Sequence, residues 1–144
     1  MILLDTNVIS EPMRLAADPA VLAWIDAQNI ETLYMAATSL AELRFGVAAL
    51  PAGKRKNTLH QNLERRVIPL FKGRILPFDM EASEVYAELR SRARNKGKAI
   101  GTADGYIAAT AAANGLAVAT RDTAPFEAVG IEVINPWRTG TRTP

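Results

Sequence analysis

Residues 1–10 read MILLDTNVIS: four apolar residues, then Asp5, Thr6 and Asn7, then apolar residues again. Apolar residues at consecutive positions indicate a short strand that is buried on both faces, as in a parallel sheet covered by helices. Asp5 lies where this strand ends, and the nearest basic residue in the sequence is Arg14. A carboxylate in this place requires either a local role in a turn or a positively charged partner from elsewhere.

The rest of the chain alternates short apolar runs with longer stretches of helical period, which is typical of βα units. The runs predict strands at Ile2–Leu4, Thr32–Met35, Arg74–Pro77, Ala117–Thr120 and Ile131–Ile134. Helices are predicted to begin near Asp18, Ser39, Lys54, Asp79 and Ala103. The segments before and after the break at Pro51 are predicted to form an αα-hairpin. The pattern predicts an α/β fold with a central, mostly parallel five-stranded sheet and helices on both faces.

Length and composition indicate one domain. The chain has 144 residues, of which 49% are hydrophobic and 22% charged, as in ordinary globular domains. We expect the domain to span residues 1–138, followed by a flexible C-terminal tail at 139–144 that has no apolar anchor. The absence of cysteine excludes disulfides and thiolate metal sites. The sequence shows neither a signal peptide nor a membrane span, so we expect a cytoplasmic protein that binds no membrane.

Four carboxylates follow the predicted strands. Asp5 ends the first strand, Asp122 follows Ala117–Thr120 after one residue, and Glu42 and Asp104 lie in the first turns of predicted helices. Because the carboxyl ends of parallel strands meet at one edge of a sheet, we expect all four acids there. Clustered acids raise one another's pKa values, and a divalent cation removes that cost. Carboxylates suit Mg²⁺ or Mn²⁺, which activate water and stabilise the charge on a phosphoryl group.

Each acid also has a purely structural interpretation, and the sequence leaves both open. Asp5 suits an Asx turn or a helix cap. Glu42 stands three residues after Ser39, as in a capping box. Asp104 complements a helix N-terminus, and Asp122 suits a turn. The four acids in register favour the metal site over four separate coincidences.

Other chemistries lack the residues that they need. A haloacid-dehalogenase-type phosphatase carries a second Asp two residues after the first, where this chain has Asn7. No GxxxxGK[ST] loop is present, and no GxGxxG motif follows a strand. The one histidine, His60, lies in a predicted basic helix, where a solvated side chain is favoured over a catalytic one. Arg90 and Arg94 share a helical face, which meets either solvent, a phosphate backbone or a partner's acids.

The segments MILLDTNVISE, SLAELRFGV, TADGYIAATAAANGLAVATRD and FEAVGIEVINPW occur in this order in the chain. As a set, they resemble the PIN-domain toxins of VapBC-type toxin–antitoxin pairs, and the similarity extends to about Trp137. The resemblance implies a single PIN domain that acts as an Mg²⁺- or Mn²⁺-dependent endoribonuclease. It maps the catalytic acids of the family onto Asp5, Glu42, Asp104 and Asp122. Of these, Asp5, Asp104 and Asp122 are the expected metal ligands.

The resemblance also extends to residues beside the acids. Thr120 matches a hydroxyl residue of the family two positions before the last acid, and Asn7 is expected to orient Asp5. Two positions depart from the family pattern. Pro125 stands where many members have an Asp, and Gly105 stands where Ala is commoner. We expect Gly105 to loosen its helix by ~1 kcal/mol at most.

The partners implied by the resemblance are an RNA substrate and a cognate antitoxin that inhibits the toxin, with an arginine directed into the acidic pocket. A homodimer and a toxin–antitoxin hetero-oligomer are also implied, with DNA bound only indirectly through the antitoxin. An alternative function is that of a dimerising partner of a DNA-binding antitoxin in promoter autoregulation, with weak or silent nuclease activity. A DNA-directed nuclease is a third possibility.

Overall fold

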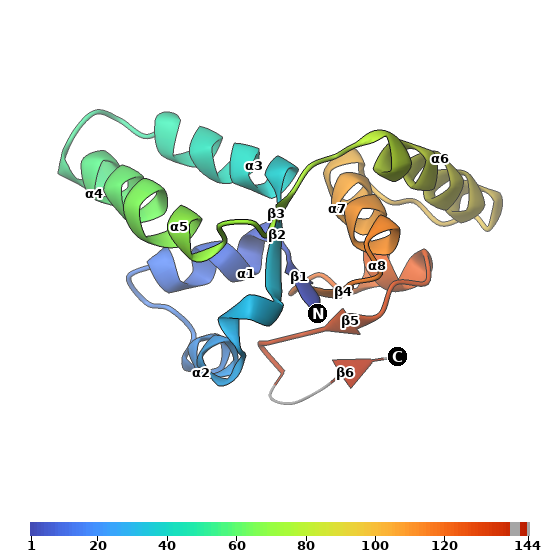
Figure 1. Cartoon of the computed structure of the whole chain (residues 1–144), viewed down its shortest axis with the longest axis horizontal. Coiled ribbons are helices and arrows are strands. Elements are labelled where there is room, and N and C mark those ends of the chain that lie inside the picture. The colour runs from blue at the N-terminus through green and yellow to red at the C-terminus, as the bar shows by residue number, and fades with distance from the viewer. Residues whose placement is uncertain (139–141, 144) are drawn as a thin grey trace.

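Strand β1, Ile2–Leu4, lies in the middle of the sheet, between β2, Leu33–Ala36, and β4, Ala117–Ala119. The structure is a computed structural model and describes residues 1–138 and 142–143 (Figure 1). The outer strands are β3, Ile75–Leu76, β5, Val133–Ile134, and β6, Arg142–Thr143, and the order across the sheet is β3-β2-β1-β4-β5-β6. Strands β1 to β5 pair in parallel, whereas β6 pairs antiparallel with β5. The predicted mostly parallel α/β sheet is therefore confirmed.

Helices cover both faces of this sheet, with α3 to α5 on one side of β2 and α6 to α8 on the other in Figure 1. They are α1 Thr6–Ser10, α2 Pro19–Ala27, α3 Ala37–Ala48, α4 Lys54–Asn62, α5 Ile68–Leu70, α6 Met80–Asn95, α7 Thr102–Ala113 and α8 Ala124–Ala128. Short 3-10 turns occupy Glu11–Met13 and Ile30–Thr32, and a π-helical segment occupies Leu63–Val67. None of the helices in the described part of the chain combines the length and apolar character of a membrane span.

The two faces of β1 belong to two different hydrophobic clusters. Leu3 is fully buried with Ile107 and Phe126, from the α7 and α8 side of the sheet. Its neighbour Leu4 packs in a cluster with Val8 and other residues of the α1 to α5 side. Alternate side chains of one strand thus enter opposite cores, which is why the strand is apolar at consecutive positions. The same burial fixes the position of the strand end that carries Asp5.

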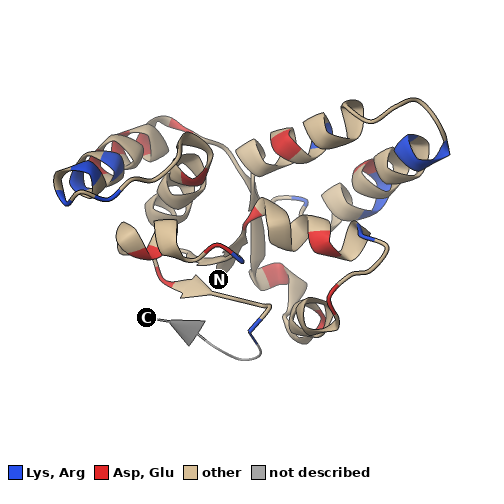
Figure 2. Cartoon of the chain, turned by 180° about the vertical axis from the view of Figure 1, so that it is seen from behind, with Lys and Arg blue, Asp and Glu red and all other residues tan. Residues whose placement is uncertain are grey.

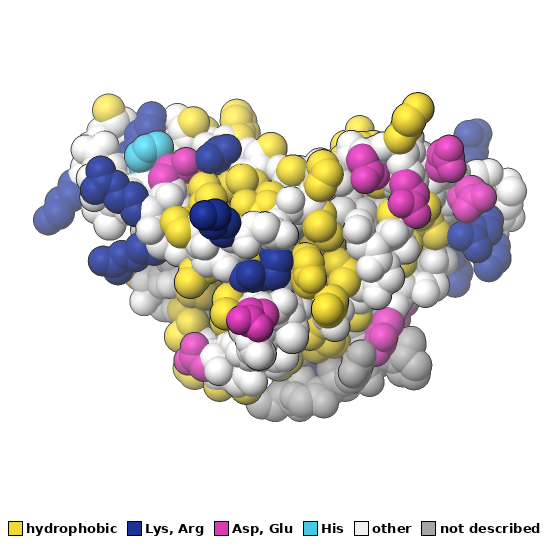
Figure 3. Space-filling view, in the orientation of Figure 1, with side chains coloured by type: hydrophobic (Ala, Val, Ile, Leu, Met, Phe, Trp, Pro, Cys, Tyr) yellow, Lys and Arg dark blue, Asp and Glu magenta, His cyan; other side chains and the backbone are white. Residues whose placement is uncertain are grey.

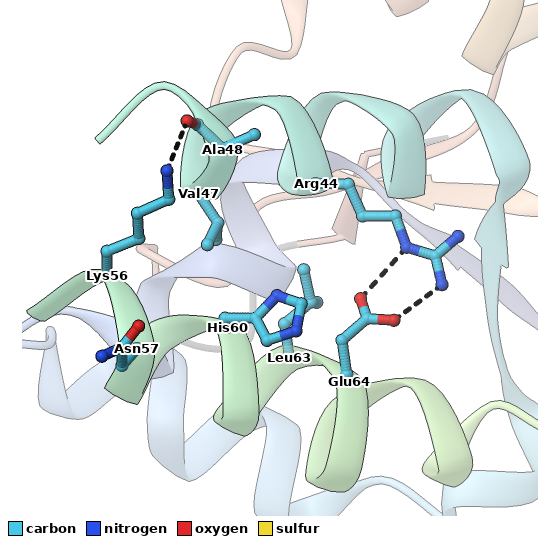
Figure 4. A pocket seen from close by; sticks show the side chains of 8 residues that line it. All are labelled: Arg44, Val47, Ala48, Lys56, Asn57, His60, Leu63 and Glu64. Carbon is cyan, nitrogen blue, oxygen red and sulfur yellow. Dashed lines mark hydrogen bonds and ion pairs between the residues drawn. The ribbon is translucent and has the colours of Figure 1, made fainter. Parts of the chain in front are cut away.

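The predicted αα-hairpin is present, with α3 and α4 joined through the break at Pro51 (Figure 4). The guanidinium of Arg44 on α3 donates two hydrogen bonds to Glu64, at 3.0 and 2.9 Å. The ammonium group of Lys56 donates to the carbonyl oxygen of Ala48 at 3.0 Å. The predicted helix from Lys54 onward contains the π-helical segment just before Pro69, a residue that has no N–H for the preceding turn.

The prediction that the helix after the second strand begins at Ser39 is wrong. Helix α3 begins at Ala37 directly after β2, and its N-cap is Ala36, which makes no side-chain capping bond. The hydroxyl of Ser39 is buried without a hydrogen-bond partner among the described residues. Because strand and helix join without a loop, Ser39 is already inside the first turn. Glu42 is consequently not the acid of a capping box.

The predicted tail at 139–144 lies partly outside the described residues. Residues 142 and 143 are described, and they form strand β6 beside β5. No apolar pattern marks this strand in the sequence, since pairing at the edge of a sheet uses backbone groups.

Gly105 allows helices α6 and α7 to approach closely. A Cβ atom at this position would lie 2.9 Å from Cε2 of Tyr86 and 3.5 Å from Cδ of Arg90. The ring of Tyr86 stacks on Tyr106 at a centroid distance of 5.0 Å and meets Phe78 edge-on at 5.9 Å. Gly105 therefore has a packing role that its helix propensity alone did not predict.

Replacing Gly105 with Ala is expected to lower the free energy of unfolding by about 1–3 kcal/mol, because the new methyl group displaces the packed Tyr86 ring. Gly46→Ala is the matched control, since Gly46 lies inside α3 with nothing within 4 Å of a Cβ. That variant is expected to gain up to ~1 kcal/mol from helix propensity. Urea unfolding measures both, and a stabilised Gly105→Ala protein would contradict the packing role.

Candidate active site at the carboxyl edge of the sheet

The four predicted acids gather at the carboxyl edge of the central strands. Asp5 follows β1 and is the N-cap of α1, and Glu42 projects from α3. Asp104 lies in the first turn of α7, and Asp122 lies between β4 and α8. Figure 2 shows acidic residues in the centre of the molecule, while Lys and Arg gather toward its two ends. The four acids thus lie in the middle of a protein whose net charge is +2.

The carboxylate of Asp5 is buried, with 6% of the residue exposed. One oxygen, Oδ1, accepts a hydrogen bond from the backbone N–H of Thr6 at 2.7 Å. The other, Oδ2, accepts a hydrogen bond from the hydroxyl of Thr120 at 2.8 Å. Burial raises the pKa of Asp5, and the charges of Glu42 and Asp122 raise it further, whereas the two hydrogen bonds oppose that rise.

Two threonine hydroxyls extend this arrangement to two further acids. Thr120 is fully buried, and its Oγ1 accepts the backbone N–H of Asp122 at 3.1 Å while donating to Asp5. The hydroxyl of Thr6 donates to Oε2 of Glu42 at 3.2 Å. Asp5, Glu42 and Asp122 therefore belong to one hydrogen-bonded chain that passes through Thr6 and Thr120.

Asp104 is coupled to the other acids by charge. Partial burial raises the pKa of Asp104, and the negative charges of Asp5 and Asp122 raise it further. Every acid of the predicted quartet is thus within electrostatic reach of at least one other. In the described part of the chain, no Lys or Arg forms an ion pair with any of them.

Nearby cations and amides are engaged elsewhere. Arg14 pairs with the buried Glu11, donating to its two carboxylate oxygens at 2.9 and 3.2 Å. The guanidinium of Arg121 lies 5.3 Å from the ring centroid of Trp137. Asn7 was predicted to orient Asp5, but its Oδ1 accepts the backbone N–H of Arg121 at 3.4 Å. Asn7 therefore ties the loop after β4 to α1, and the structure shows no bond from it to Asp5.

Thr6 is the site residue that the sequence interpretation missed. It supplies both a backbone N–H to Asp5 and a hydroxyl to Glu42. The sequence signal that could have identified Thr6 is its position directly after Asp5, the acid that ends a strand, because a helix can begin there. The helix-cap interpretation of Asp5 was correct as far as it went, since Asp5 does cap α1. Capping and clustering with other acids are both properties of the same carboxylate.

The donor set suits a hard divalent cation, because it consists of carboxylates without a cation of the chain beside them. Each Asp5 oxygen accepts one hydrogen bond and keeps a lone pair for a further partner. In the side-chain positions described, residues 1–138 contain no three Asp, Glu or His groups close enough to share one ion. The backbone brings the four acids to one edge of the sheet, and their side chains would have to move to reach the distances of metal ligands.

Comparison with known proteins finds similarity along nearly the whole chain. A family model described as PIN domain matches residues 2–132. The chain is 62% identical to VapC ribonuclease Y4jK of Sinorhizobium fredii over 137 residues, which cover 95% of this chain and 98% of that protein. It is 56% identical to toxin FitB of Neisseria gonorrhoeae over 137 residues, which cover 95% of this chain and 99% of that protein.

A solved structure of FitAB bound to an IR36 DNA fragment has the same fold. It superposes with a TM-score of 0.95 at 52% sequence identity, covering 98% of this chain and 99% of that one. The resemblance predicted from the four sequence segments is therefore confirmed by sequence and by structure.

Thr120→Val is expected to lower the free energy of unfolding by about 1–3 kcal/mol, because it leaves a buried Asp5 oxygen and the Asp122 N–H without their partner. Thr120→Ser keeps the hydroxyl and is expected to retain more of the stability. Urea unfolding at neutral pH measures the difference. If the valine variant were as stable as the serine variant, the hydroxyl would not hold the site together.

The raised pKa of Asp104 predicts a pH-dependent stability difference. Its pKa in the folded protein lies above the ordinary value of 3.8, so folding favours the protonated form. The stability from this group is complete below the ordinary pKa and is lost as pH rises through the raised pKa. In metal-free buffer, Asp104→Asn should therefore gain stability relative to the wild type as pH rises above the ordinary pKa of 3.8 and through the raised pKa.

Thermal unfolding across this range measures the effect, with Asp26→Asn on the exposed face of α2 as the control. The difference between Asp104→Asn and wild type should grow with pH, while the control difference stays flat. A flat profile for Asp104→Asn would show that neither burial nor the neighbouring acids raise the pKa of Asp104.

Proposed function

The chain belongs to the PIN-domain family, in its toxin–antitoxin branch, and from this premise we propose that it is an endoribonuclease dependent on Mg²⁺ or Mn²⁺. The observation that carries the proposal is the gathering of four carboxylates at one edge, without an ion pair to Lys or Arg in the described part of the chain. The name of its relative Y4jK, a VapC ribonuclease, supports RNA as the substrate. Hydrolysis of a phosphodiester bond is the chemistry that such a site serves.

In this proposal, Asp5, Asp104 and Asp122 hold the cation, and Glu42 completes the acidic edge. When bound, such an ion activates water and neutralises the charge that develops on the phosphodiester. Asp5 is positioned by Thr6 and Thr120, so its carboxylate is fixed before any ligand arrives. Glu42 and Asp122 are exposed and face the solvent from which RNA approaches.

We further propose a cognate antitoxin as the inhibitor and homodimerisation of the toxin. The solved structure of FitAB, at 52% identity, supports a two-component assembly. The acidic edge suits an arginine from such a partner, because a guanidinium binds carboxylates in a bidentate manner and brings the missing positive charge.

A second candidate function is favoured by the DNA fragment in that FitAB structure. In this alternative, the chain is mainly a dimerising partner of a DNA-binding antitoxin, and nuclease activity is weak or silent. Contact with DNA is then indirect, through the antitoxin. Acid-to-amide variants would keep full operator affinity as a complex and would lose no phenotype in cells.

Cleavage of RNA by the purified toxin is expected with Mg²⁺ or Mn²⁺ and not with EDTA. Asp104→Asn should lower the rate on the order of 100-fold or more, because it removes a proposed ligand. Asp26→Asn, an exposed acid on α2, is the matched control and should cleave like wild type. Equal cleavage by the wild type and both variants, in EDTA and in metal, would contradict the metal-dependent mechanism.

Thermal unfolding gives a second readout that does not depend on activity. Mn²⁺ should raise the Tm of wild type and of Asp26→Asn, because a ligand that binds only the folded state stabilises it. Asp104→Asn should lose most of this shift. Stabilisation without cleavage, together with operator binding by the toxin–antitoxin complex, would favour the regulatory alternative over the nuclease.

A further inference from the structure

A cavity lies between α6 and the segment that leads into α7. Its volume is about 580 Å³, and three of its lining residues are the cations Arg90, Arg94 and Lys98. Tyr86 and Ile100 also line the cavity, and its described lining contains no Asp or Glu. The charge of the side chains that line this cavity is therefore opposite to that of the acidic edge.

The three cations have no carboxylate partner in the part of the chain that the structure describes. Ion pairs there form at Arg14 with Glu11 and at Arg44 with Glu64, both on other elements. Cations at the end of a helix are favoured by its dipole, which accounts for Arg92 and Arg94 in the last turn of α6. The dipole does not account for the convergence of three cations on one cavity, where they repel one another unless an anion binds.

The sequence of α6 builds this convergence. Tyr86, Arg90 and Arg94 recur every four residues and so lie on one face of the helix. Gly97 follows the helix with a φ of +71°, a conformation that glycine adopts without strain, and the chain then turns back so that Lys98 reaches the same cavity. In Figure 3, acidic side chains gather over α6 and basic ones gather at its outer end. Acidic and basic side chains are thus segregated along this helix.

Arg90 is held in place before any ligand arrives. Its Nη1 donates to the hydroxyl of Tyr86 at 2.7 Å, and its guanidinium lies 5.5 Å from the centroid of the Tyr86 ring. Tyr86 is itself fixed by stacking on Tyr106 of α7. A guanidinium that is already ordered loses less conformational entropy when it binds an oxyanion.

Arg90 of this cavity packs against α7, the helix that carries Asp104. The side chain of Arg90 comes within 3.5 Å of the position of a Cβ at Gly105, which directly follows Asp104. The aromatic rings here pack on one another, Tyr86 on Tyr106 and Phe78 against both, so they already serve as each other's partners.

We propose that this cavity binds the sugar-phosphate backbone of single-stranded RNA and so holds the strand against the helix pair that carries Asp104. The proposal rests on the ribonuclease function proposed above. Arg90, Arg94 and Lys98 contact phosphate oxygens, and Tyr86 fixes Arg90. Because such contacts are made with phosphate rather than with bases, binding through this cavity is largely independent of RNA sequence.

RNA affinity in EDTA tests the cavity apart from catalysis. The probe is a short fluorescein-labelled single-stranded RNA, followed by fluorescence anisotropy at several salt concentrations. Arg94→Gln/Lys98→Gln is expected to weaken binding about tenfold and to lower the slope of log K against log salt by about 1.4, because two phosphate contacts are lost. Arg65→Gln/Arg66→Gln removes the same charge from the exposed surface after α4 and should bind nearly as wild type does.

The two proposals fail separately in this design. Equal affinity of the two double variants overturns the RNA cavity, even if the wild type cleaves RNA with metal. If the wild type does not cleave, but its RNA binding in EDTA still depends on Arg94 and Lys98, the ribonuclease function fails and the cavity stands. Retained RNA affinity with loss of antitoxin binding would assign the cavity to a protein partner and overturn the proposal.

Where the wild type cleaves RNA, kinetics provide a further check. Arg94→Gln/Lys98→Gln should raise KM and leave kcat within about twofold, since it removes binding outside the reacting phosphodiester. A fall in kcat at unchanged KM would contradict a role in binding the backbone.

Discussion

The hydrogen bond from the Thr120 hydroxyl to Asp5 joins the ends of two neighbouring strands whose residues lie 115 positions apart in the sequence. It forms because β1 and β4 pair in parallel with Leu4 opposite Ala119, so the next residue of each strand emerges at the same edge. Asp5 then caps α1, Thr6 reaches Glu42, and Thr120 receives the N–H of Asp122. The geometry of the acidic edge thus depends on strand register, which is set in turn by burial of Leu3 and Leu4 in opposite cores.

The positive charge that this edge lacks is not supplied by the described part of the chain. Arg14 neutralises Glu11, Arg44 neutralises Glu64, and Arg121 lies over Trp137. Burial and mutual repulsion both raise the pKa values of Asp5 and Asp104. The fold therefore holds acids that repel one another at the carboxyl edge of the sheet, and a bound cation or a partner's guanidinium would relieve that repulsion. Such repulsion is typical of a functional site rather than of a structural ion pair.

The sequence predicted the parts of this protein that follow from burial and chain order, and the remainder depends on contacts between distant segments. The apolar strands, the αα-hairpin and the placement of acids after strands could be inferred because each leaves a local pattern. The start of α3 could not be inferred, since β2 continues into the helix without a loop. Ser39 is a residue type that often caps a helix, but here it lies inside the first turn. The bond from Asn7 to Arg121 and the packing of Gly105 against Tyr86 involve partners from other elements of the chain. The antiparallel β6 pairs with the nearby β5 through backbone groups, which leave no side-chain pattern.

The acidic edge and the basic cavity pose one electrostatic problem when they are considered together. Four carboxylates repel an RNA backbone, so the energy that holds a strand there must come from outside the edge. In the proposed complex, the cations on α6 would supply it, and Gly105 keeps α6 close to α7, the helix that carries Asp104. A uniform basic surface would neutralise the acids and remove the cation site. Separation of the two charges across one helix pair would let the same strand of RNA reach both the proposed cation site and the proposed phosphate-binding cavity.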